Sequence, residues 1–104
     1  MLDTSGKVRG KYELGALAVD LDSYSAKLGG RDLDVSSSQL ELLAVLVANK
    51  DRVMDRGELA HILALRHDRT IDVLLTGLRQ QIGREFVRNV RSRGWIIDQS
   101  AFTE

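Results

Sequence analysis

The chain has 104 residues and no cysteine, and its 15 Lys and Arg residues balance 15 Asp and Glu residues. This length suits one domain with a single modest core, and the lack of cysteine excludes disulfides, thiolate metal sites and thiol nucleophiles. No apolar run reaches the roughly 20 residues of a membrane-spanning helix, and the N-terminus lacks the apolar core of a secretory signal. We therefore expect a cytoplasmic protein without a membrane partner.

The N-terminal third predicts an antiparallel sheet. Residues 1–11 are expected to form a flexible arm, and residues 12–35 alternate between apolar and polar side chains, which is typical of strands. Within this region LGALAVDLD predicts one strand, followed by a hairpin that turns at Gly29-Gly30.

Residues 36–83 predict three helices. Ser36 and Gln39 form a capping box ahead of an apolar stripe at Leu40, Leu43, Leu46 and Val47. A second helix is expected from the Asp55 cap, with Glu58 at its third position, to about Leu65. The third helix is capped by Asp68 or Thr70, runs to about Gln81 and stops at Gly83.

The third helix has two distinct faces when 100° is assigned to each residue. One face is apolar and holds Ile71, Leu74, Leu75, Leu78 and Ile82. The opposite face holds Arg69, Val73, Thr76 and Gln80, with Asp72 on its flank. A helix that is merely solvated usually interleaves Glu and Lys, so a small polar face that is almost free of acids is unusual for such a helix.

Residues 86–98 predict a hairpin whose tip, Ser92-Arg93-Gly94, carries arginine. We expect Gly94 to allow the tight turn. A sheet, two helices joined by a short link and a final hairpin define an α+β winged helix-turn-helix fold, here spanning residues 12–100.

The zero net charge conceals a basic segment. Residues 66–93 hold seven Arg and three acidic residues, whereas residues 1–65 hold eight basic and ten acidic residues. Guanidinium groups bind phosphates and base edges bidentately, although a solvated charged face is the commoner explanation of such asymmetry.

Four strings in order then resemble the OmpR/PhoB-type effector domain, the DNA-binding half of many bacterial response regulators. The resemblance runs from about Gly15 to Asp98. The strings are LDVSSSQLELLAVL, RVMDRGELA, RTIDVLLTGLR and VRNVRSRGWII. The third reproduces the family's arginine-threonine-aliphatic-aspartate opening, and the fourth is close to its valine-arginine-glycine-x-glycine-tyrosine wing.

The resemblance implies sequence-specific binding of double-stranded DNA by a transcription regulator of a two-component system. Residues 69–82 would be the recognition helix in the major groove, and the wing, residues 89–94, would lie at the minor groove, where negative potential attracts arginine. Trp95 takes the family's aromatic position and is expected to pack under the recognition helix.

The resemblance also implies roles for individual residues. Val73 matches a thymine-contacting position, Arg79 and Asn89 match phosphate-contacting positions, and Arg91 matches the wing arginine. Gly77 stands where many relatives carry a base-reading arginine, so base reading falls to Thr76 and Gln80, with Arg69 and Arg93 adding phosphate contacts. The complete expected DNA-binding set is Arg69, Thr70, Val73, Thr76, Arg79, Gln80, Asn89, Arg91 and Arg93.

Further partners follow from the same family: a second copy on an adjacent direct repeat, and RNA polymerase. Some relatives contact the polymerase through the loop between the second and third helices, which is only about residues 66–68 here and therefore short for such a contact. We expect no enzyme and no cofactor, because the sequence has no cysteine, no glycine-rich phosphate loop and no GxSxG motif. We expect no metal site, because His61 and His67 have the wrong spacing for two ligands on one helical face. A winged-helix module that binds protein instead of DNA remains the alternative, favoured by the zero net charge, Gly77 and an exposed Val73.

Overall fold

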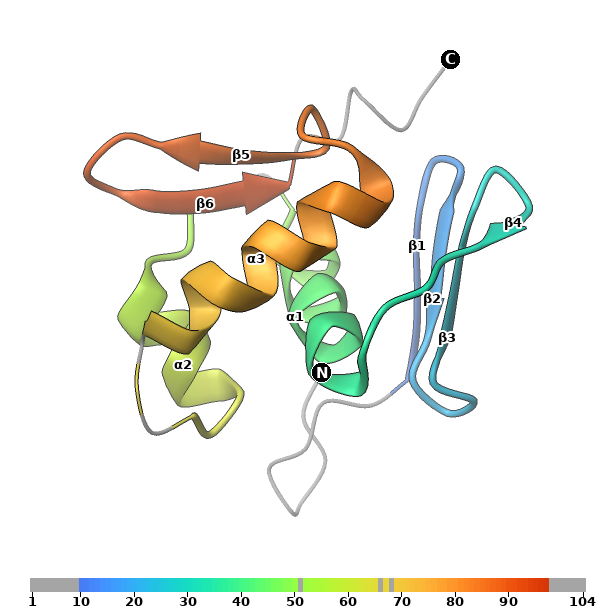
Figure 1. The fold of residues 1–104 in the computed structure, drawn as a ribbon, viewed down its shortest axis with the longest axis horizontal. Coiled ribbons are helices and arrows are strands. Elements are labelled where there is room, and N and C mark those ends of the chain that lie inside the picture. Colours follow the sequence, from blue (N-terminus) through green and yellow to red (C-terminus); the bar gives the residue numbers. More distant parts are fainter. Residues whose placement is uncertain (1–9, 51, 66, 68, 98–104) are drawn as a thin grey trace.

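The computed structural model describes residues 10–97 except residues 51, 66 and 68. Within these residues the chain forms a four-stranded sheet, then three helices, then a two-stranded hairpin (Figure 1). The predicted α+β winged helix-turn-helix is confirmed. Most of the expected arm and residues 98–100 of the expected domain lie outside the described residues, while Lys11 already belongs to the first strand.

The N-terminal sheet is antiparallel throughout, and its strands follow one another in chain order. The strands are β1 (Lys11–Leu14), β2 (Leu17–Asp20), β3 (Ser25–Leu28) and β4 (Arg31–Asp32). The predicted turn at Gly29-Gly30 joins β3 to β4. The prediction of a single strand before that hairpin was wrong: the chain reverses at Gly15, whose φ is +57°, so that Leu14 pairs with Leu17 and both side chains are buried.

Helix α1 (Ser37–Ala48) lies at the centre of the molecule. Its predicted cap is confirmed, since Ser36 Oγ accepts from the Gln39 N–H and Gln39 Oε1 accepts from the Ser36 N–H. The predicted apolar stripe is buried, and so are Leu42, Ala44 and Val45 on the remaining sides. A helix that is apolar all round must be covered all round, and α1 packs against β1, β2, α3 and the final strand.

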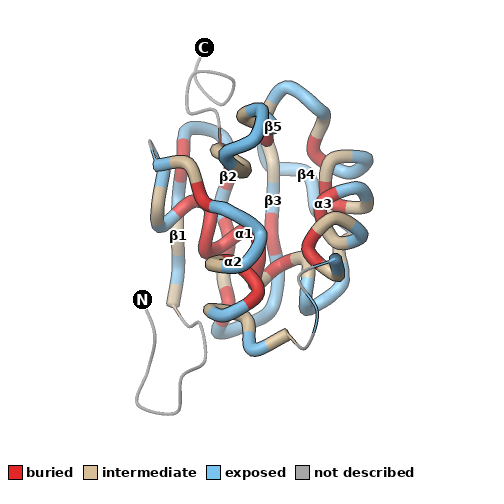
Figure 2. The backbone as a smooth tube through the Cα atoms, turned by 90° about the vertical axis from the view of Figure 1, so that its left-hand side faces the viewer, coloured by how far each residue is buried: buried red, intermediate tan, exposed pale blue. Residues whose placement is uncertain are grey.

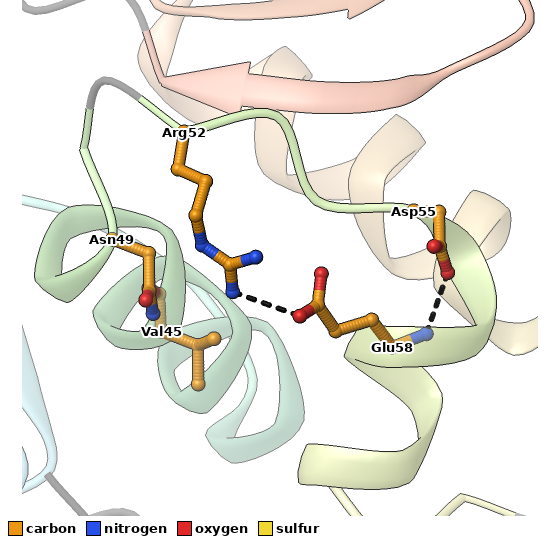
Figure 3. A network of polar contacts seen from close by, with 5 residues as sticks. All are labelled: Val45, Asn49, Arg52, Asp55 and Glu58. Carbon is orange, nitrogen blue, oxygen red and sulfur yellow. Dashed lines mark hydrogen bonds and ion pairs between the residues drawn. The ribbon is translucent and has the colours of Figure 1, made fainter.

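A short polar network connects α1 to α2 (Arg56–Ile62). Asp55 Oδ1 accepts from the Glu58 N–H at 2.7 Å, as expected for the N-cap. The Glu58 carboxylate does not complete a capping box but instead forms an ion pair with Arg52 at 2.8 Å (Figure 3). Since this pair is partly exposed, it contributes at most about 1 kcal/mol.

Two predicted helix limits need correction. Helix α2 ends at Ile62 instead of near Leu65, because Ala64 adopts a left-handed φ of +57°. Helix α3 (Arg69–Ile82) contains Thr70 in its first turn, so Thr70 is not the cap. The other candidate cap, Asp68, lies outside the described residues. Gly83 ends α3 as predicted, with φ +102°.

The C-terminal hairpin, which we call the wing, consists of β5 (Val87–Val90) and β6 (Gly94–Ile97). It is shorter than the predicted 86–98, because Phe86 lies in the preceding turn, and residue 98 is outside the described part. Among the described residues no helix is long and apolar enough to cross a membrane.

Candidate nucleic-acid interface

The outward face of α3 is the first part of the candidate interface. Its inward residues, among them Ile71, Leu75 and Leu78, are at most 1% exposed. The four residues predicted for the outward face are all exposed: Arg69, Val73, Thr76 and Gln80. Figure 2 shows the same division, since each turn of α3 is buried on the side that faces α1 and exposed on the opposite side. The helical period alone therefore placed this face correctly.

Val73 is 72% exposed, which is unusual for an apolar residue in the middle of a structured helix. Burying this side chain against a ligand would be favourable because it removes apolar surface from water. An apolar contact is what a thymine methyl group would offer.

Thr76 presents less hydrogen-bonding capacity than its sequence position suggested. Its hydroxyl donates to the Asp72 carbonyl within the same helix at 2.9 Å. The side chain therefore presents a methyl group and the lone pairs of its oxygen, whereas the Gln80 amide forms no hydrogen bond with any described residue. Of the two expected base readers, Gln80 alone has a free donor in this structure.

One flank of α3 faces α2 and the wing. Asp72 pairs with Arg56 of α2 at 3.1 Å. The Arg79 guanidinium lies over the Trp95 ring, 5.3 Å from its centroid, in cation–π geometry. Arg79 Nε is buried and has no hydrogen-bond partner among the described residues. Trp95 packs partly buried under α3, as expected, and Arg79 connects the two elements.

The base of the wing is fastened to the segment before α2. Met54 and Trp95 exchange two backbone hydrogen bonds of 2.8 Å, which add Met54 to the hairpin as an isolated bridge. Gly94 makes this approach possible, since a Cβ there would overlap the Met54 carbonyl oxygen and lie 2.8 Å from Asp55 Cα. Gly94 directly follows the turn and has a φ of +142°, while Ser92, with φ +64°, lies within the turn itself.

The wing tip carries the second part of the interface. Arg91 and Arg93 are exposed, and neither forms an ion pair with a carboxylate in the part of the chain that the structure describes. Asn89 Nδ2 donates across the hairpin to the Gly94 carbonyl at 3.2 Å, so Asn89 stabilises the tip.

An open cavity of about 490 Å³ lies between the wing tip, the start of α2 and Asp72 of α3. Its lining includes Arg56, Asn89 and Arg93 together with the carboxylates of Asp55 and Asp72. Seven of the nine predicted residues thus form two groups, four on the α3 face and three at the wing tip, with this mixed-charge cavity between them. The other two lie outside these groups, since Thr70 is half-buried and Arg79 lies over Trp95.

Sequence reasoning missed the contact between Gln39 and Gly77. Gln39 was assigned only to the cap of α1, but its side-chain amide lies against Gly77 of α3. One signal could have revealed the contact. A glycine in the interior of a helix costs about 1 kcal/mol relative to alanine and often marks a close approach.

Comparison with known proteins identifies the domain. A family model described as "Transcriptional regulatory protein, C terminal" matches residues 30–97, well over half of the chain. The chain belongs to this family. The domain is 28% identical over 91 residues to the transcriptional regulatory protein QseB of Haemophilus influenzae, an alignment that covers 84% of this chain and 41% of QseB. This domain therefore spans less than half the length of such curated relatives.

Solved structures support the same fold. The C-terminal effector domain of Acinetobacter baumannii BfmR is 28% identical, with a TM-score of 0.67 over 88% of this chain and 92% of that one. The Klebsiella pneumoniae RstA DNA-binding domain, solved in complex with the RstA box, superposes with a TM-score of 0.77. It is 23% identical, and the match covers 86% of this chain and 97% of the RstA chain.

Proposed function

We propose that this chain is the DNA-binding domain of a bacterial transcription regulator and binds double-stranded DNA in a sequence-specific way. Helix α3 enters the major groove, and the wing tip, residues 89–94, lies at the minor groove. Family membership supports the proposal, because the family is one of transcriptional regulatory proteins and not a class of enzymes.

The observation that carries the proposal is the exposure of Arg91 and Arg93 on a hydrogen-bonded turn, in a domain whose outward α3 face has no acidic residue. Guanidinium groups held on a short turn fit the concentrated negative potential of a narrow minor groove. The backbone bonds between Met54 and Trp95 fasten the wing to the segment before α2, and Arg79 of α3 lies over Trp95, so we expect both groups to contact one duplex.

The larger protein is also part of the proposal. Since this domain corresponds to less than half of its curated relatives, we infer a two-component response regulator that acts in the cytoplasm. Two copies would occupy adjacent direct repeats, and RNA polymerase would be a further partner.

Protein binding is the second candidate function, and the exposed Val73 favours it. The two functions differ in their dependence on salt. Binding to phosphates releases counterions, so that affinity for DNA falls steeply as the salt concentration rises. Apolar contacts with a protein partner would weaken little under the same change.

The test is selection from a pool of random duplexes, followed by measurement of affinity for the selected duplex at several salt concentrations. Replacing both wing arginines (Arg91→Ala with Arg93→Ala) should weaken binding and flatten the slope of log K against log salt by about 2, since each phosphate contact contributes about 0.9. Lys27→Ala with Arg31→Ala removes the same charge from the N-terminal sheet and should leave the slope nearly unchanged.

Failure to recover any duplex at low salt would reject DNA binding. Equal slopes for the two double variants would instead remove the wing from the interface while retaining DNA as the ligand.

A further inference from the structure

The side chain of Gln39 lies against α3 and has a donor that the cap of α1 does not use. Gln39 belongs to α1, which begins beside α3 (Figure 1). A Cβ built on Gly77 would overlap Nε2 of Gln39 and lie 3.5 Å from its Cδ. The amide therefore occupies the position that a side chain at residue 77 would need.

The orientation of this amide is fixed by its cap. Its Oε1 accepts from the Ser36 N–H at 2.8 Å, and since an N–H can only donate, the oxygen must be the atom that faces Ser36. Nε2 is then the end that lies over Gly77, and it donates to no acceptor among the described residues. The two N–H donors of the amide therefore lie against α3 and remain unused within the described part of the chain.

The position of Gly77 places these donors at the edge of the candidate interface. Gly77 lies on one i, i+4 ridge between Val73 and Gln81, about 40° around the helix from each. Val73 is 72% exposed, so the ridge leads directly from the outward face to the amide. An edge position is where the phosphates that border a groove would pass.

The charges of α1 near the amide are also compatible with a phosphate. The first turn of α1 contains no acidic residue, and the positive end of the helix dipole lies there. Glu41, one turn farther along, accepts a hydrogen bond from the Tyr24 hydroxyl at 3.2 Å, on the side of the N-terminal sheet.

We propose that Gln39 is a DNA-contacting residue, whose Nε2 donates a hydrogen bond to a phosphate oxygen at the edge of the major groove. It supplies from α1 a contact that Gly77 cannot make from α3. This inference rests on the proposed function, and its ligand is the DNA backbone, so it should affect affinity without changing the preferred sequence.

Gln39→Glu is the decisive substitution. Glutamate retains the acceptor for the Ser36 N–H, since a glutamate at this position is the usual partner in a capping box, but it replaces the donor with a negative charge. We expect at least about tenfold weaker binding of the duplex selected by the unsubstituted chain, an unchanged selected sequence and an unchanged Tm.

Ser37→Glu is the matched control. It adds the same charge to the same turn of α1, but about 200° around the helix from Gln39, and should weaken binding less than about threefold. Equal losses in Gln39→Glu and Ser37→Glu, or no loss in either, would overturn the proposal.

Gly77→Ala gives a second test if Gln39→Glu alters Tm. The new methyl group displaces the amide without adding charge, so binding should again weaken at an unchanged selected sequence, and unaltered affinity would also overturn the contact. A chain that selects no duplex at all would reject the proposed function itself. A chain that selects a duplex insensitive to residues 39 and 77 would reject the Gln39 contact alone.

Discussion

At the scale of single residues, the wing depends on the absence of one side chain. Gly94 has a φ of +142°, a conformation that L side chains rarely adopt, and its α-carbon faces the Met54 carbonyl. A side chain at residue 94 would therefore have two costs, backbone strain from the positive φ and steric overlap with Met54, and these costs have different origins. Comparing Gly94 with a glycine that has only the first cost separates them.

Gly94→Ala should destabilise the fold by clearly more than about 1 kcal/mol, because the new Cβ must push the Met54 backbone away from Trp95. Gly29→Ala is the control: it also has a positive φ, +60°, but a Cβ there meets nothing within 4 Å, so its cost should stay near 1 kcal/mol. Urea unfolding of both variants measures the difference. Equal values would show that the close approach at Met54 relaxes freely.

At the scale of elements, the backbone at the end of α2 is strained at one residue, and a glycine there would relieve the strain. The Leu65 N–H donates to the Ala60 carbonyl and the Ala64 N–H to the His61 carbonyl, which is the paired pattern of a Schellman motif. The left-handed position of that motif is usually glycine, but here it is Ala64, with φ +57°. This local terminator explains why α2 is shorter than its apolar pattern predicted.

Ala64→Gly should therefore stabilise the protein by up to about 1 kcal/mol, since glycine adopts positive φ without steric cost. Ala18→Gly is the contrasting variant. Ala18 is exposed in the middle of β2, where glycine should destabilise by roughly 0.5–1 kcal/mol. A loss of stability in both variants would mean that Ala64 is not strained.

At the scale of the whole molecule, one core joins the sheet, the helices and the wing. Leu17 of β2, Leu42 of α1 and Ile97 of β6 are each at most 2% exposed and belong to one cluster of buried residues. Helix α1 contacts the N-terminal sheet on one side and α3 and β6 on the other. The described part of the chain should consequently unfold as one unit.

The single tryptophan allows this to be measured, because Trp95 reports on the wing while far-UV circular dichroism reports mainly on the helices. The two signals should give the same urea midpoint. Leu17→Ala, in the distant sheet, should lower both by the same amount, equivalent to about 2–5 kcal/mol. If the Trp95 transition keeps its midpoint while the helical signal shifts, the wing is a separate unit.

Much of the fold could be predicted because local chemistry and periodicity specify it. The Ser36 and Asp55 caps, the stop at Gly83 and the two faces of α3 depend on residues within a turn or two of one another. The wrong prediction in the N-terminal sheet also concerned a local feature, but the sequence there is compatible with two structures. LGALAVDLD reads as one alternating strand, and only the pairing of Leu14 with Leu17 shows that the chain reverses at Gly15.

The sequence predicted which residues belong to the candidate site, but it did not predict the tertiary contacts that hold them in place. The sequence by itself determined the exposed α3 face and the arginines of the wing, because helical period and hairpin turns are set by neighbours along the chain. Only the tertiary structure decided that Gly94 serves the approach of Met54, that Arg79 lies over Trp95, and that Gln39 fills the space above Gly77. Each of these contacts joins residues at least 16 positions apart, and their distance depends on how helices and hairpin pack around the common core.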